Sequence, residues 1–147
     1  MKSAWVAMPG RAFVDTNVFV YSVDTAEPKK QEAAQRVIDA TPDLVVSTQV
    51  LNEFYTIATR KLAYPLPPEE AATAVEWMSR FSCIPVDADL VLRAIKAGQR
   101  WQLSHWDALM VAAARQAGCD RLLTEDLSDG ASYDGLRVEN PFPGTDG

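Results

Sequence analysis

Short hydrophobic runs alternate with amphipathic stretches along the whole chain. The runs are rich in β-branched residues and have the length of buried strands, while the stretches between them follow the 3.6-residue period of helices. Alternation of this kind is typical of an α/β fold with a mostly parallel sheet that helices cover on both faces. The pattern predicts strands at 12–14, 44–46, 83–86, 121–124 and, at the sheet edge, 136–139, with helices near 17–24, 28–41, 48–63, 68–80, 87–100 and 104–118.

Length and composition favour a single domain. The 147 residues are 48% hydrophobic, which suffices for one core. Because no linker, repeat or low-complexity tract interrupts the chain, we expect one domain over 11–142 with flexible ends at 1–10 and 143–147. No run approaches the roughly 20 apolar residues of a membrane span, and the opening segment is broken too early by Pro9 to be an export signal. We therefore expect a cytoplasmic protein, with Met8 as an alternative start.

Charge and cysteine content narrow the classes of function. The net charge of −6 argues against a general nucleic-acid coat protein, which would be basic. It is compatible with a nuclease, which needs only a local basic rim around an acidic metal pocket. Cys83 and Cys119, each expected to open a strand, have no second Cys or His at metal-ligand spacing. We interpret them as buried apolar residues of a reducing compartment.

Four acidic residues occupy positions where predicted strands end or helices begin. Asp15 follows the first strand, Asp126 follows the fourth, Asp107 lies at the start of the last helix, and Glu53 borders the apolar face of its helix. Since parallel strands end at one edge of the sheet, we expect these carboxylates to meet there. Carboxylates that lie close together repel one another, and a divalent cation removes that repulsion. Ligation by oxygen alone suits Mg²⁺ or Mn²⁺ better than zinc.

The same acids also have structural explanations. An Asp that ends a strand commonly caps the next helix, although Thr16 could cap the helix that follows Asp15. Ser104-x-x-Asp107 is a capping box at a helix start, where the positive helix end keeps a carboxylate ionised for capping or for metal binding. Glu53 alone could be an ordinary boundary residue that lies beside the core rather than in open water. The set of four, and no single position, carries the metal-site hypothesis.

The fourth acid has two competitors in its own neighbourhood. Glu125 and Asp129 lie beside Asp126 in the sequence. We favour Asp126 because an acid two residues beyond Thr124, at the end of the strand, can turn back over the sheet edge. Asp129 stays an open alternative.

Basic and aromatic residues are the candidates for substrate contacts. Arg60 lies two turns beyond Glu53 on the same polar stripe, so we expect it to meet a phosphate, with Lys61 and Arg11 as further candidates. Trp101 and Trp106 could stack on bases, but buried packing is the favoured interpretation.

The single histidine is a weak candidate for a catalytic base. His105 lies about 200° around the helix from Asp107. We interpret it as a rim or packing residue, because metal-assisted chemistry does not require a histidine base.

An ordered series of short motifs resembles a known family. The series is Asp15-Thr16-Asn17, Asn52-Glu53, Ser104-x-x-Asp107-Ala108, Leu123-Thr124-Glu125-Asp126-Leu127 and Val138-x-Asn140-Pro141-Phe142. It resembles the PIN-domain ribonucleases, and among them the VapC-type toxins of bacterial toxin–antitoxin pairs, over residues 12–142.

The resemblance implies a fold, a site and partners. The fold would be a three-layer α/β/α sandwich. Asp15 and Asp107 would be the main ligands of Mg²⁺ or Mn²⁺, Glu53 and Asp126 would complete the acidic pocket, and further residues would orient the site, namely Asn17 and Thr124. The substrate would be RNA, hydrolysed by a metal-activated water. A small antitoxin would place a basic arm in the pocket, and the chain would form a homodimer, through the apolar helices near 48–80.

Two rival functions use a similar architecture. A phosphotransfer protein, either a phosphatase or a receiver, would need a second Asp two residues after the first or an adjacent acidic pair, and also a Lys at a strand end. This chain has Asn17 two residues after Asp15, and no such Lys. A PIN-like domain retained only as a binding scaffold would not need to bind Mn²⁺. Labelling by a phosphoryl donor would support the first rival, and absence of metal affinity would support the second.

Overall fold

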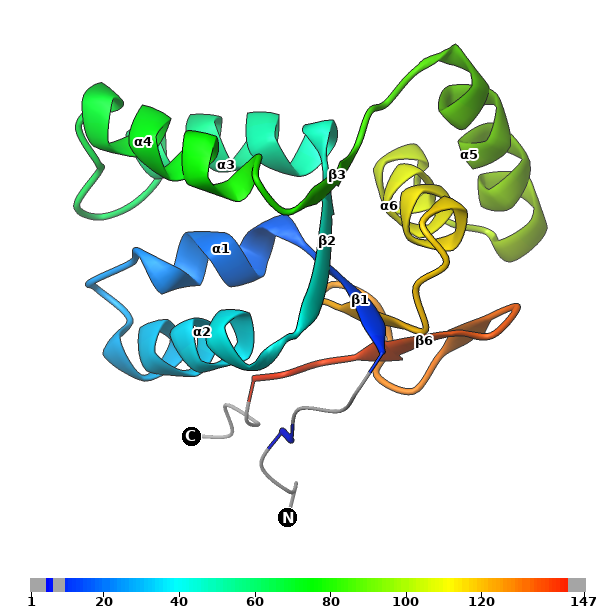
Figure 1. Cartoon of the computed structure of the whole chain (residues 1–147), viewed down its shortest axis with the longest axis horizontal. Coiled ribbons are helices and arrows are strands. Elements are labelled where there is room, and N and C mark those ends of the chain that lie inside the picture. The colour runs from blue at the N-terminus through cyan, green and yellow to red at the C-terminus, as the bar shows by residue number, and fades with distance from the viewer. Residues whose placement is uncertain (1–4, 7–9, 143–147) are drawn as a thin grey trace.

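A six-stranded sheet lies between two groups of helices (Figure 1). The structure is a computed structural model that describes residues 5–6 and 10–142. Its elements, in chain order, are β1 (Arg11–Val14), α1 (Thr16–Ser22), α2 (Pro28–Ala40), β2 (Asp43–Ser47), α3 (Thr48–Arg60), α4 (Pro68–Met78), β3 (Ser82–Ile84), α5 (Ala88–Trp101), α6 (His105–Gln116), β4 (Arg121–Leu123), β5 (Ser132–Tyr133) and β6 (Leu136–Glu139).

The strand order is β3-β2-β1-β4-β6-β5, and every pair is parallel except β5 with β6. Strands β1 and β4 are neighbours in the middle of the sheet, with Val14 opposite Leu123 at their carboxyl ends. The residues that follow these two strands are therefore brought side by side, although more than a hundred residues separate them in the chain.

Helices cover both faces of the sheet. Helices α1 to α4 pack together on one face, and α5 and α6 form a tightly packed pair on the other (Figure 1). Helix α6 contacts β2, β4 and β6, and α5 lies outside it. The three-layer α/β/α sandwich with a mostly parallel sheet is thus confirmed.

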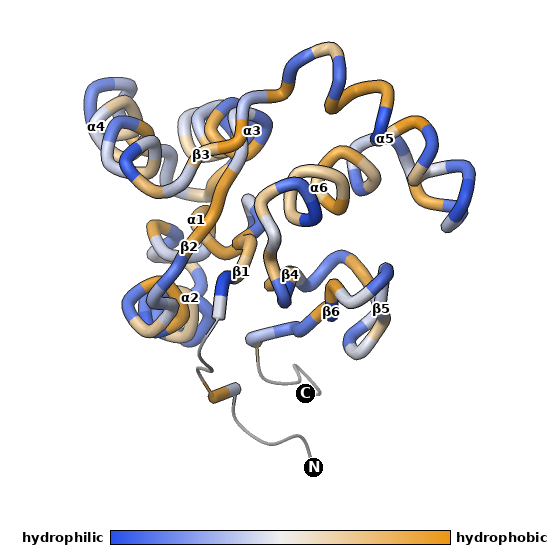
Figure 2. Tube along the Cα trace, turned by 45° about the vertical axis from the view of Figure 1, so that its right-hand side comes forward, coloured by the Kyte–Doolittle hydropathy of each residue, from blue (hydrophilic) through white to orange (hydrophobic). Residues whose placement is uncertain are grey.

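The hydrophobic runs of the sequence form the buried core of the fold. Phe13, Val45 and Leu122 on the central strands are completely buried, and Figure 2 shows hydrophobic residues concentrated on β2 and the adjoining α1. Helix α6 is buried at every position from Ala108 to Ala114, because it lies between the sheet and α5. Its small alanines let α5 approach closely.

The predicted edge strand at 136–139 is not at the edge. Strand β5 pairs outside β6 through a hairpin whose turn is Asp134-Gly135, with φ angles of +52° and +91°. Asp-Gly is a favoured pair for such two-residue turns, because both positions need positive φ. Asp134-Gly135 is therefore the sequence signal for this hairpin. It was overlooked because β5, the strand directly before it, has only two residues.

The other boundaries match the expected elements to within about three residues. Cys83 is the second residue of β3, and Cys119 lies two residues before β4, so neither opens its strand. Within the described residues, no helix combines the length and apolar character that membrane crossing requires. The predicted flexible ends lie mostly outside the described residues and stay a prediction, as does the single-domain boundary at 11–142.

Candidate active site

Asp15 is fixed at the end of β1 by its role as a helix cap. Its backbone N–H donates to the Leu123 carbonyl oxygen at 3.0 Å, which extends the pairing with β4. Its Oδ1 accepts a hydrogen bond from the Thr16 N–H at 2.6 Å, so Asp15 is the cap of α1. Thr16 does not cap, contrary to the alternative considered above, and its buried hydroxyl has no hydrogen-bond partner among the described residues. Asp15 itself is only 8% exposed.

Thr124, directly after β4, joins two of the predicted acids. Its hydroxyl is completely buried, donates to Asp15 Oδ2 at 2.7 Å and accepts from the Asp126 N–H at 3.0 Å. Asn17 Nδ2 lies 3.3 Å from Asp15 Oδ2 and donates to it. These contacts, both to Oδ2, fix the orientation of the Asp15 carboxylate. Within the described chain, the buried Oδ1 of Asn17 has no partner, so the site retains one unused oxygen acceptor.

The carboxyl groups influence one another electrostatically. Burial raises the pKa of Asp15 from 3.8 to about 7, against hydrogen bonds from Thr124 and Thr16 that lower it, and the charges of Asp126 and Glu53 add to the rise. Loss of solvent is also the largest cause of the raised pKa of Asp126.

The same interactions connect Glu53 and Asp107 to the group. Loss of solvent raises the pKa of Glu53, and the charges of Asp126 and Asp107 raise it further. Asp107 also raises the pKa of Asp126. Each of the four predicted acids therefore interacts with at least two of the others. We call these four residues the acidic site.

Asp107 lies on the first turn of α6. The Ser104 hydroxyl accepts a hydrogen bond from the Asp107 N–H at 3.2 Å, as the capping box predicts. No hydrogen bond from another described residue engages the Asp107 carboxylate, so the cap leaves its oxygens free for another partner.

The two competitors of Asp126 are engaged elsewhere. Glu125 accepts a hydrogen bond from the Tyr21 hydroxyl at 2.6 Å and lies 3.7 Å from the Lys30 ammonium. Asp129 accepts a hydrogen bond from the Asn140 N–H at 3.0 Å. The contacts therefore favour Asp126 as the fourth acid.

One expectation about side-chain placement holds in part, and another is wrong. Glu53 is exposed, but it lies next to the buried Phe54 and loses enough solvent to raise its pKa. Arg11 begins β1 and so lies at the opposite edge of the sheet from the acidic site, where it pairs with Asp43 at 3.0 Å and donates to the Ala117 carbonyl oxygen. Its distance along β1 from Asp15 removes it as a phosphate contact for the scissile bond.

Arg60 and Lys61 are exposed at the carboxyl end of α3. Seven residues separate Arg60 from Glu53, which is about 10 Å along the helix axis. They stay candidates for phosphates next to the scissile bond.

A cavity of about 480 Å³ opens beside Glu53, between α3 and α6. Trp106 lines it and is 66% exposed, so the expectation that this ring packs in the interior is wrong. Trp101 does pack, edge-on to Tyr133 at 5.3 Å between ring centres. His105 is exposed and contacts the Trp106 ring, which agrees with a rim position. The remaining lining residues are Thr48, Gln49, Asn52, Val86 and Leu109.

The acidic site fits a divalent cation in charge and in ligand type. Carboxylates whose pKa values rise through burial and mutual repulsion are stabilised in their ionised form by a cation, and all four side chains offer oxygen. In the described part of the chain, however, no three His, Cys, Asp or Glu residues lie close enough to hold an ion between them as the side chains stand. Side-chain movement of the exposed Glu53 and Asp126 would have to accompany binding.

Several solved structures with a similar fold are toxins or toxin–antitoxin complexes. A toxin–antitoxin complex from Klebsiella pneumoniae superposes with a TM-score of 0.69 at 21% identity, covering 89% of this chain and 98% of that chain. DNA-bound VapBC from Salmonella typhimurium gives 0.62 at 20% identity, covering 89% and 98%. Mycobacterium tuberculosis VapC20, described as a sarcin-ricin loop cleaving toxin, gives 0.60 at 24% identity, covering 76% and 86%. At these identities the similarity establishes the fold.

The family assignment comes from the sequence itself. No protein with a curated description matches the chain significantly. The family model of the PIN domain matches residues 12–128, which spans most of the chain and all four members of the acidic site. The chain therefore belongs to the PIN-domain family.

Proposed function

We propose that the protein is a metal-dependent endoribonuclease and acts as the toxin of a toxin–antitoxin pair. The observation that carries the proposal is the acidic site, in which carboxyl groups from four separate segments interact at the carboxyl edge of the sheet. Membership of the PIN family supports a nuclease. The similar structures, which include a toxin–antitoxin complex and a sarcin-ricin loop cleaving toxin, support the toxin role.

In this proposal, Asp15 and Asp107 would hold Mg²⁺ or Mn²⁺, and Glu53 and Asp126 would complete the pocket. The ion would supply Lewis acidity at the phosphodiester and would make a water molecule more acidic. The chain's own contribution is orientation: the Thr124 hydroxyl keeps Asp15 Oδ2 in place.

Substrate contacts would surround the acidic site. Arg60 and Lys61 would bind neighbouring phosphates, and Asn17 would orient the pocket through its hydrogen bond to Asp15. The exposed ring of Trp106 offers a base a stacking surface beside Glu53. RNA with unpaired bases suits such a surface better than a duplex does.

The partners in this proposal are an antitoxin and a second copy of the chain. A basic arm of the antitoxin would neutralise the acidic site. Exposed aromatic residues on or near α3 and α4, namely Tyr55, Tyr64 and Trp77, support a homodimer contact in the region 48–80. We place the protein in the cytoplasm, where its RNA targets are.

The test is cleavage of a mixed RNA pool by the purified chain without antitoxin. We expect cleavage with Mn²⁺, none with EDTA, and a loss of about 10³-fold or more in Asp15→Asn and Asp107→Asn, because metal ligation contributes several kcal/mol to the transition state. Asn remains a good helix cap, so Asp15→Asn should fold. A folded protein that neither binds Mn²⁺ nor cleaves RNA would support the scaffold alternative instead.

The phosphotransfer alternative gains no support from the site. The described hydrogen-bond partners of the Asp15 carboxylate are Thr16, Asn17 and Thr124, and no lysine is among them. Membership of the PIN family also argues against it.

A further inference from the structure

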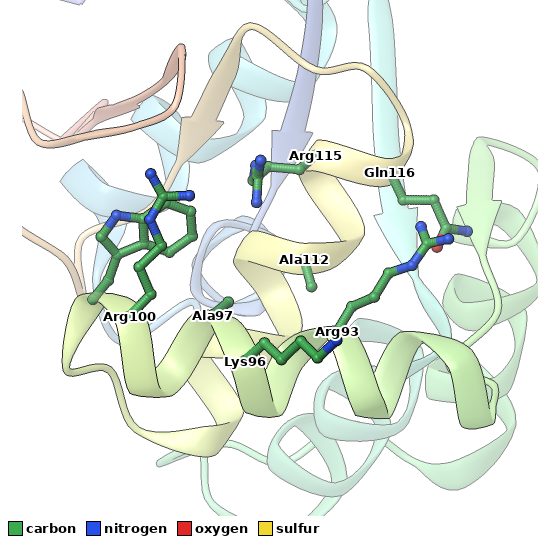
Figure 3. Close-up of a pocket in the computed structure, with 8 residues that line it drawn as sticks. Arg93, Lys96, Ala97, Arg100, Ala112, Arg115 and Gln116 are labelled. Atoms are coloured by element: carbon green, nitrogen blue, oxygen red, sulfur yellow. The ribbon is translucent and has the colours of Figure 1, made fainter.

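Four basic residues line a cleft of about 370 Å³ between α5 and the carboxyl half of α6. Arg93, Lys96 and Arg100 project from α5, and Arg115 projects from the end of α6 (Figure 3). The three α5 residues recur at intervals of three and four, which places them on one side of the helix. We call this feature the α5–α6 cleft.

The positive charge of this cleft is largely uncompensated. The chain has 14 basic and 20 acidic residues in total, so four basic residues around one cleft are a strong local excess. Asp134 binds Arg100 through two hydrogen bonds, at 2.6 and 3.0 Å, and lies 3.4 Å from Arg115. Arg93 and Lys96 make no ion pair with any described residue. A net positive patch on an acidic protein favours a negatively charged partner.

Two of the guanidinium groups are held in fixed positions. Arg100 and Arg115 lie 4.5 and 5.1 Å from the centre of the Trp101 ring, as cation–π contacts. Trp101 in turn packs against the buried Tyr133. A planar guanidinium group matches phosphate oxygens in geometry and, held in this way, loses little side-chain freedom on binding. In Arg100, both terminal nitrogens already donate to Asp134.

The cleft lies away from the scissile position but on the same helix. Arg115 is eight residues beyond Asp107 on α6, which corresponds to about 12 Å along the axis. Residues at that distance cannot bind the reacting phosphate, whereas they can bind phosphates further along the same strand. An acidic site repels a phosphate backbone when metal is absent, so attraction has to come from another surface.

We propose that the α5–α6 cleft binds phosphates of the RNA substrate several nucleotides from the cleaved bond. The inference rests on the proposed nuclease function and adds to it the surface that holds the substrate. Contacts of this kind position RNA without reading its sequence, and their strength falls with salt.

The experiment compares two double variants of the full chain. Arg93→Gln/Lys96→Gln removes the two unpaired cations of the cleft, and Lys29→Gln/Arg137→Gln removes two exposed cations outside the cleft with the same change in net charge. Binding of a labelled single-stranded RNA is measured in EDTA over a range of KCl concentrations, so that no cleavage occurs. Cleavage with Mn²⁺ is measured separately.

We expect the cleft variant to reduce the slope of log K against log salt by about 1.4, since each phosphate contact to a single strand contributes about 0.7. KM for a long RNA should rise while kcat is retained, and an RNA too short to reach the cleft should be unaffected. The control variant should change the slope much less.

Several results would overturn the inference. An unchanged slope in the cleft variant, or an equal loss in both variants, would refute a specific site. If native protein cleaves RNA and the cleft variant binds it normally, only the cleft assignment fails; if native protein neither binds nor cleaves RNA, the proposed function fails with it.

Discussion

The acidic site and the α5–α6 cleft are opposite in charge and differ in how the chain builds them. The acidic site takes its four carboxylates from segments that the parallel sheet brings to one edge, and its buried member, Asp15, is held by hydrogen bonds. The cleft takes three of its four cations from one exposed helix. The strand order of the sheet brings the residues of the acidic site together, whereas the residue spacing along α5 brings the cations of the cleft together. Buried charge is costly without a partner, so the acidic site should be sensitive to pH and metal, whereas the cleft should be sensitive to salt.

The largest expected effect is the loss of folding stability that follows ionisation of the buried Asp15 carboxyl. Its pKa is raised from 3.8 to about 7 in the folded protein, so between these pH values the folded state binds more protons than the unfolded state. Metal-free protein should therefore lose stability as pH rises from about 4 to 7 and then level off, by at most about 4 kcal/mol. Denaturant unfolding at pH 4 and pH 8 measures this loss.

Asp15→Asn is the control, because it keeps the cap and cannot ionise. At pH 8, the free energy of unfolding of the native protein should be lower, relative to that of Asp15→Asn, than it is at low pH. Mn²⁺ at pH 8 should restore native stability through binding and leave the variant unchanged. A native protein that gains stability over the variant with rising pH would show that Asp15 is not a strained carboxylate.

The next effect separates the two candidates for the fourth acid. Asp126→Asn should lower kcat about 10²-fold, because it removes a charge from the acidic site. Asp129→Asn is the matched control: Asn can still accept the hydrogen bond from the Asn140 N–H, so activity should change by less than about threefold. Steady-state cleavage of one RNA measures both. The reverse result would place Asp129 in the site.

The comparison also shows what the sequence could and could not predict. Hydrophobic periodicity located nearly every helix and strand, because burial against a sheet constrains residues such as Phe13 and Val45 on both faces. The short strand β5 escaped this pattern because two residues carry no period. The acids were predictable since Asp15 directly follows β1, Asp126 lies three residues beyond β4, and the ends of these two strands must meet.

Side-chain environment was harder to predict than position. Trp106 was expected to pack and is largely exposed, because it lies on the first turn of α6, before the buried stretch from Ala108 to Ala114. The cations of the α5–α6 cleft were overlooked although Arg93, Lys96 and Arg100 share one side of a predicted helix. Spacing shows that they are neighbours, but only the packing of α6 beside them makes a cleft.

The exposed ring of Trp106 provides a smaller effect, at the border of the acidic site. Trp106→Ala should weaken RNA binding roughly tenfold, since stacking on one base contributes about 1–3 kcal/mol. Protein stability should hardly change, because the ring is 66% exposed. Trp106→Phe should recover most of the affinity if stacking is the cause. Equal losses in both variants, measured in EDTA, would indicate a different role for the indole.

The smallest expected effect is a gain in RNA binding at the α5–α6 cleft. Asp134→Asn removes the only described carboxylate that pairs with Arg100 and Arg115, and Asn tolerates the positive φ of +52° at this turn. Exposed ion pairs contribute at most about 1 kcal/mol, so stability should change little. Two freed guanidinium groups should make the salt dependence of RNA binding steeper, by at most about 1.4 in slope. Weaker binding would instead mean that Asp134 serves mainly to hold the two arginines in position, and that their orientation matters more to the substrate than the charge it cancels.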